Sequence, residues 1–170
     1  MYIACVLIDH FPSKIEATRN FDLEKQRIIV FQKNDPNRTV LDDSLSNQYT
    51  AYQASDKNIQ ESNKNTVLVG GDISEYQQIF DRIMLSLGKI SPILDTPKLG
   101  HAYICIDGLK DMYGGEARLI SNLLQTIPPY LKPRLGISEG KFPAYLAATY
   151  AEPGNSYKPD AKIKEFMSAF

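Results

Sequence analysis

The sequence predicts an α+β fold of the ferredoxin-like kind, in which an antiparallel or mixed sheet carries helices on one face. The first observation is a continuous apolar run at residues 1–8 (MYIACVLI), typical of a strand buried on both faces. The second is the order of patterns from residue 66 onward, which reads strand, helix, strand, strand, helix, strand, helix. The third is size, because 170 residues with 43% hydrophobic content can form a core and a small additional lobe. Many unrelated proteins share this fold, so it does not decide function.

Composition limits the possible partners and the compartment. The net charge is −1 and the isoelectric point is near 6.1, so no overall basic field favours nucleic acid. Cys5 and Cys105 lie within apolar runs, which predicts buried, reduced thiols. No apolar run is long enough for a membrane span, and the N-terminal residues lack the charged and apolar regions of a signal peptide. We therefore expect a cytoplasmic protein without a membrane partner.

The first 41 residues contain three candidate strands and one short helix. The run at residues 1–8 is expected to be a central strand, and Pro12 suits the first turn of a helix that reaches about Thr18. The segment Arg27–Gln32 (RIIVFQ) predicts a second strand, and residues 39–41 a weaker third.

Residues 42–65 differ in composition from the rest of the chain. They are rich in Asp, Ser, Asn, Gln and Lys and show little periodicity (DDSLSNQYTAYQASDKNIQESNKN). This pattern predicts a small, polar and mobile lobe with a solvated loop rather than a binding device.

A strand, a turn and a long helix are predicted next. Residues 66–69 resume an apolar strand pattern, Gly70 and Gly71 are expected to turn the chain, and Asp72 is a natural helix N-cap. Residues 73–90 carry apolar side chains at three- and four-residue spacings, which predicts a helix with one buried face.

The second half of the chain predicts a hairpin followed by helix, strand and helix. Residues 91–109 (SPILDTPKLGHAYICIDGL) form two short strand patterns joined by a Pro-Lys-Leu-Gly turn. A helix is expected at residues 115–127, ended by Pro128 and Pro129, then a strand at 133–138 and a helix at 142–150.

Four segments, in the same order, resemble the Y-family (translesion) DNA polymerases. They are residues 8–16 (IDHFPSKIE), 71–92, the hairpin at 91–109, and 135–154 (LGISEGKFPAYLAATYAEPG). The resemblance implies a palm made of residues 1–10 and 66–156, a reduced fingers-like lobe at 11–65, and the start of a truncated thumb at 157–170. In that family the chain continues into a thumb and a little-finger domain, and whether the native protein extends beyond Phe170 stays open on the sequence alone.

The positions that the resemblance assigns to metal-binding carboxylates hold other residues. They read Leu7, Gly100 and His101, and the next aspartate of the hairpin motif reads Cys105. Nucleotidyl transfer uses two divalent cations, and Mg²⁺ requires hard oxygen ligands. Glycine and leucine provide none, and a neutral imidazole is a poor Mg²⁺ ligand. The sequence therefore predicts no catalytic residues, no metal and no cofactor at this site.

Details of the same segments resemble the ImuB-like branch, in which the polymerase carboxylates are lost. That resemblance implies a non-catalytic accessory or scaffold in DNA repair and translesion synthesis, whose partners would be a sliding clamp and a replicative-type polymerase. DNA binding would be weak, through domains outside this chain, and the protein would associate with the nucleoid when working. The fingers motif for the triphosphate has no clear counterpart, and Glu152 replaces a basic residue.

Four alternatives remain open on the sequence alone. A divergent active polymerase could bind Mg²⁺ through Asp9 with Asp95 or Asp107. His101 could act as a general base, and Lys141, at the expected start of a helix, could bind phosphate or DNA or be a solvated surface lysine. The chain could also be a ferredoxin-like interaction domain unrelated to DNA.

Overall fold

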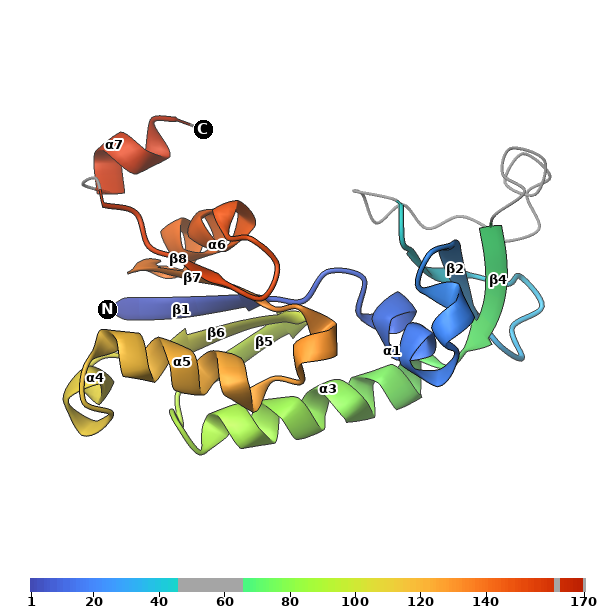
Figure 1. The fold of residues 1–170 in the computed structure, drawn as a ribbon, viewed down its shortest axis with the longest axis horizontal. Coiled ribbons are helices and arrows are strands. Elements are labelled where there is room, and N and C mark those ends of the chain that lie inside the picture. Colours follow the sequence, from blue (N-terminus) through green and yellow to red (C-terminus); the bar gives the residue numbers. More distant parts are fainter. Residues whose placement is uncertain (46–65, 161–162, 170) are drawn as a thin grey trace. The chain divides into compact units, whose positions relative to one another are not determined.

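The computed structural model of the chain describes residues 1–45, 66–160 and 163–169 (Figure 1). The chain divides into two compact units. The larger unit comprises Met1–Asp9 and Phe80–Phe170, and the smaller unit comprises His10–Ile79. Most of the polar lobe predicted at residues 42–65 lies outside the described residues.

The larger unit is built on a five-stranded mixed sheet with β1 at its centre. The strand order is β5-β6-β1-β7-β8, β1 is antiparallel to both β6 and β7, and β7 is parallel to β8. The strands are β1 (Tyr2–Leu7), β5 (Leu94–Lys98), β6 (His101–Cys105), β7 (Arg134–Glu139) and β8 (Ser156–Tyr157). The predicted α+β class and the central position of the first strand are confirmed.

Helices cover both faces of this sheet, whereas the sequence predicted helices on one face. Ile3 and Cys5 of β1 pack with Ala144 and Ala148 of α6, while Ala4, which alternates with them, is buried on the other side. Figure 1 shows α6 on one side of the sheet and α5 and α3 on the other. The helices of the larger unit are the C-terminal part of α3 (Ile73–Gly88), α4 (Leu109–Met112), α5 (Glu116–Thr126), α6 (Lys141–Tyr150) and α7 (Ile163–Met167), with a 3-10 turn at Pro129–Leu131.

Gly136 explains why a helix can lie so close to β7. A Cβ atom at this position would come within 2.1 Å of the Ala148 nitrogen and 2.2 Å of the Ala144 carbonyl oxygen. The absent side chain and the small alanines of α6 together allow helix and strand backbones to approach. The close contact between α6 and β7 allows α6 to cover the face of the sheet opposite α3 and α5.

The hairpin turn is tighter than the four-residue turn that the sequence predicted. β5 continues through Pro97 to Lys98, which pairs with His101, so the connection consists of Leu99 and Gly100. Gly100 has a φ of 78°, a left-handed conformation that favours glycine. Pro97 is accommodated because β5 is an edge strand and its register is irregular between Asp95 and Lys98.

The smaller unit combines a three-stranded sheet with short helices. The strand order is β3-β2-β4, with β2 antiparallel to β3 and parallel to β4. Its elements are α1 (Phe11–Arg19), a 3-10 turn at Phe21–Leu23, β2 (Arg27–Gln32), β3 (Val40–Asp43), β4 (Thr66–Gly71) and the first residues of α3.

Asp42 and Asp43 correct the expectation of a polar loop from residue 42 onward. Both belong to β3 and are buried, at 3% and 5% exposure. Asp42 accepts the Ser13 backbone N–H at 3.1 Å and lies 2.9 Å from His10 Nδ1, and Asp43 accepts Arg27 Nε–H at 2.9 Å. Buried carboxylates are tolerated because these groups pair with them.

The Gly70-Gly71 pair also differs from its prediction, because both residues belong to β4 instead of a turn. A Cβ on Gly71 would lie 1.9 Å from the Tyr76 hydroxyl oxygen. That hydroxyl is buried and donates to Glu16 Oε1 at 2.6 Å. The predicted N-cap is confirmed, since Asp72 Oδ1 accepts the Ser74 backbone N–H at 3.0 Å.

Candidate functional site

The three positions that lack the expected carboxylates meet at one end of the larger sheet. Leu7, the last residue of β1, pairs with His101, the first residue of β6. The Ile8 backbone N–H donates to the Gly100 carbonyl at 2.7 Å. On its other side Leu7 pairs with Arg134 of β7. The structure therefore brings Leu7, Gly100 and His101 together, and this set supplies no carboxylate oxygen.

His101 is buried within an aromatic cluster. Its ring centroid lies 4.7 Å from that of Tyr103 and 5.4 Å from that of Tyr145, on which it stacks. Its Nε2 atom is 3.6 Å from Cys5 Sγ, and its buried Nδ1 has no hydrogen-bond partner among the described residues.

Burial determines the protonation states of His101 and Cys5. Desolvation lowers the pKa of His101, Lys98 lowers it further, and Asp95 opposes the shift. Burial raises the pKa of the Cys5 thiol to about 12. Neutral imidazole beside a protonated thiol is unsuited to holding Mg²⁺.

Asp9 is engaged with a cation of the neighbouring strand. Its Oδ2 lies 3.0 Å from Arg134 Nε, an ion pair without the alignment of a hydrogen bond. Arg134 also donates from Nη1 to the Thr149 carbonyl of α6 at 3.4 Å. The Asp9 carboxylate thus balances a fixed cation beside Leu7.

Asp95 and Lys141 form a second ion pair, with Asp95 opposite Tyr103 in the middle of β6. Lys141 Nζ lies 2.7 Å from Asp95 Oδ2 and 5.4 Å from the ring centroid of Tyr103. The Lys141 ammonium lowers the pKa of Asp95, mainly through its hydrogen bond. Lys141 begins α6, where the sequence analysis expected a helix N-terminus, but its ammonium is already paired.

Asp107 lies away from Asp9, the first of the candidate carboxylates. It follows β6 and accepts the Tyr2 backbone N–H at 2.8 Å, whereas Asp9 follows the opposite end of β1. Five residue steps along a strand separate Tyr2 from Leu7, about 16 Å. Asp9 and Asp107 are therefore not brought together, and no group of three or more His, Cys, Asp or Glu residues that could hold a metal occurs in the described part of the chain.

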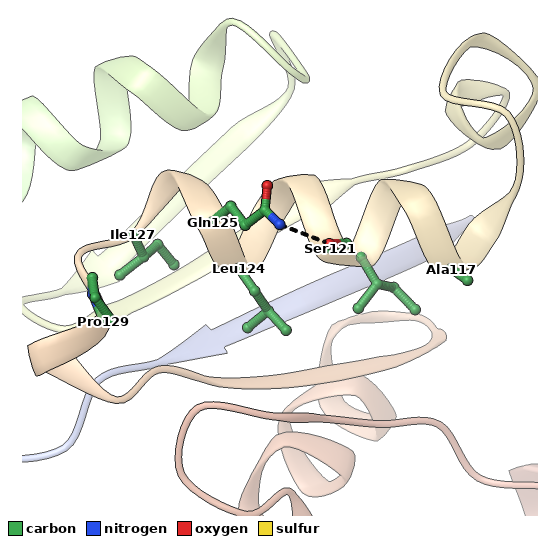
Figure 2. Close-up of a pocket in the computed structure, with 7 residues that line it drawn as sticks. Ala117, Ser121, Leu124, Gln125, Ile127 and Pro129 are labelled. Atoms are coloured by element: carbon green, nitrogen blue, oxygen red, sulfur yellow. Dashed lines mark hydrogen bonds between the residues drawn. The ribbon is translucent and has the colours of Figure 1, made fainter.

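An apolar groove on α5 was not found from the sequence. Figure 2 shows its lining residues, and its volume is about 450 Å³. A signal was present, because Ala117, Ile120 and Leu124 recur at three- and four-residue spacing beside the buried Leu119 and Leu123. The groove is lined by Ala117, Ile120, Ser121, Leu124, Gln125, Ile127 and Pro129.

Sequence comparison finds relatives among curated DNA polymerases. The chain is 27% identical over 105 residues to DNA polymerase IV of Dehalococcoides mccartyi strain BAV1, and 25% identical over 105 residues to that of strain CBDB1. Each match covers 60% of this chain and 27% of the relative. No protein-family model matches the sequence.

Solved polymerase structures share the fold. DinB from Sulfolobus solfataricus superposes with a TM-score of 0.71 at 17% identity, over 94% of this chain and 48% of that one. A post-insertion binary complex of Dbh DNA polymerase gives 0.73 at 16% identity, over 98% and 51%. The chain thus spans about half the length of the polymerases whose fold it shares.

The fold and the sequence match define the class of protein. Nearly the whole chain shares the fold of about half of the Y-family DNA polymerase Dbh, and 105 of its residues are similar in sequence to part of DNA polymerase IV. The resemblance predicted from the four sequence segments is confirmed at this level. Among the described residues no helix is long and apolar enough to cross a membrane.

Proposed function

We propose that this chain is the non-catalytic, polymerase-like part of an accessory protein in DNA repair and translesion synthesis, of the ImuB-like kind. The observation that carries the proposal is the row formed by Leu7, Gly100 and His101, which converge in space without a carboxylate. A two-metal phosphoryl transfer needs carboxylates at these positions to hold the cations.

The remaining acidic residues do not compensate for this loss. Asp9 is paired with Arg134, Asp95 with Lys141, and Asp107 lies at the far end of β1. Both ion pairs are at least partly exposed, so breaking one would cost little. The alternative of an active polymerase with relocated Mg²⁺ ligands is disfavoured because no group of three or more possible ligands occurs among the described residues.

The partners are proposed on the same basis. The matched Dbh structures include an insertion ternary complex and a post-insertion binary complex, so the shared fold is one that those polymerases use with their substrates. For this protein we propose weak DNA contact, a sliding clamp and a replicative-type polymerase as partners, no resident cofactor, and a cytoplasmic, nucleoid-associated location.

The test is calorimetric titration of the chain with a deoxynucleoside triphosphate, with and without Mg²⁺ or Mn²⁺. We expect no metal-dependent heat. Metal-dependent binding that disappears in Asp9→Asn would overturn the proposal in favour of a relocated metal site.

A variant with restored carboxylates provides the positive control. Leu7→Asp, Gly100→Asp and His101→Glu together place three acidic side chains on the paired ends of β1 and β6. If this variant folds, Mn²⁺ binding should appear in it and be absent from the unaltered chain. Circular dichroism checks the fold, and the single variant Leu7→Asp serves as an intermediate if the triple variant does not fold.

A further inference from the structure

A small cavity lies at the opposite end of β1 from His101. Its volume is about 170 Å³, comparable with the cavity of about 150 Å³ that holds a benzene ring in another protein. Ile106 and Leu119 are buried and provide an apolar floor, and Tyr2 forms a wall. Gly108 lies at its edge, where a Cβ atom would have no heavy atom within 4 Å. The cavity suits a compact apolar group.

Two of the four charged side chains that line the cavity neutralise each other. Lys158 Nζ lies 2.8 Å and 2.9 Å from the two carboxylate oxygens of Glu116. The same ammonium lies 5.4 Å from the ring centroid of Tyr2. The hydrogen bond to Glu116 is the main reason why the pKa of Lys158 is raised. The charges of Lys158 and Glu116 therefore balance each other, and the two side chains form part of the cavity wall.

The other two charged side chains keep binding capacity. Asp107 accepts the Tyr2 backbone N–H at its Oδ1, while among the described residues its Oδ2 has a long 3.9 Å contact with Cys105 Sγ and no shorter hydrogen bond. Lys110 is exposed, and within the described ranges its ammonium has no ion-pair partner. A carboxylate and an ammonium thus border one apolar cavity, each able to accept a ligand group of opposite charge.

We propose that this cavity binds a small zwitterion with a compact apolar body, the chemical class of an α-amino acid. The ligand carboxylate would pair with Lys110, its ammonium with Asp107, and its side chain would pack on Ile106 and Leu119. The four charges of the wall sum to zero, so a ligand without net charge is the best match. This inference does not depend on the proposed role in DNA repair.

The test uses three probes with the same branched body. Leucine carries both charges, 4-methylpentanoate lacks the ammonium, and 3-methylbutylamine lacks the carboxylate. Binding is followed by amide chemical shifts of Gly108 and Leu119 in the full chain. We expect saturable shifts with leucine, and about two- to fivefold weaker binding for each single-charge analogue, the contribution of one exposed ion pair.

Variants assign each charge to its partner. Lys110→Gln should remove the advantage of leucine over the amine, and Asp107→Asn, which keeps the acceptor for Tyr2, should remove its advantage over the acid. Lys89→Gln, an exposed lysine on another part of the larger unit, is the control for net charge. The proposal is overturned if leucine causes no saturable shifts at millimolar concentration, or if both site variants bind all three probes as the unaltered chain does.

Discussion

At the scale of single residues, one imidazole changes the chemistry of a whole sheet end. His101 is held by Tyr103 and Tyr145 in a buried position, where a charged ring would lose its solvation. A carboxylate at the same position would need a cation or exposure to water. Neutral, aromatic packing therefore occupies the position at which the family resemblance predicted a metal-binding carboxylate.

This burial gives the protein a pH-dependent stability. Burial lowers the pKa of His101 in the folded state below its ordinary value of about 6.5. The unfolded chain then binds more protons just below pH 6.5, so stability should fall as the pH drops below that value and recover above it. Urea unfolding between pH 5 and 7.5 measures this. His101→Gln should reduce the slope relative to the unaltered chain, and an unchanged slope would contradict the assignment.

A second prediction at this scale concerns Tyr76. Its buried hydroxyl donates to Glu16 at 2.6 Å, and Arg19 Nη1 donates to the same carboxylate at 3.1 Å. Tyr76→Phe removes one donor from a buried carboxylate and should lower the free energy of unfolding by about 1–3 kcal/mol. Tyr130→Phe, at an exposed position, is the control and should change it little. Equal effects of both substitutions would show that Glu16 does not depend on this bond.

At the scale of elements, the sequence predicts helices and strands that have a regular apolar pattern. It does not predict those whose burial depends on residues far away in the chain. Apolar periodicity located β1, β2, α3 and α6 to within a few residues. Strand β3 was extended by Asp42 and Asp43, whose burial depends on His10, Ser13 and Arg27, and a polar pattern gives no sign of such pairing. The short elements α4 and β8 are too brief for any period to show.

The candidate site shows the same division. Leu7, Gly100 and His101 could be identified because they fall within recognisable motifs, and the register confirms that they meet. The partners of Asp9 and Asp95 could not be identified. Arg134 and Lys141 are far away in the sequence, and only strand pairing and the docking of α6 bring them close.

The contact of α6 with β7 yields the prediction at this scale. Gly136→Ala places a methyl group against two backbone atoms, which cannot move without displacing the helix. We expect a loss of about 1–3 kcal/mol or more in the free energy of unfolding. Gly88→Ala is a matched control, because a Cβ there meets nothing within 4 Å and no positive φ opposes it. Thermal denaturation compares them, and similar melting temperatures would contradict the close-packing argument.

At the scale of the whole molecule, charge limits how the chain can meet DNA. The net charge is −1, and Arg134 and Lys141 are each paired with a carboxylate of the same unit. Electrostatic affinity for DNA scales with the number of phosphates neutralised, with a slope of about −0.9 per contact in log K against log salt. Lys98, opposite His101, is a further exposed cation at this end of the sheet, so we expect few phosphate contacts here.

We accordingly predict weak binding of duplex DNA with a shallow salt dependence, a slope no steeper than about −3. Fluorescence anisotropy at increasing salt concentration measures it. Asp95→Asn releases Lys141 and should strengthen binding and steepen the slope by about one contact. Glu116→Gln changes the net charge equally but releases Lys158 instead of Lys141, so it should have a smaller effect if Lys141 contacts the DNA. Equal effects of the two variants would mean that DNA affinity depends only on net charge. A steep slope in the unaltered chain would mean that cations elsewhere form the DNA interface.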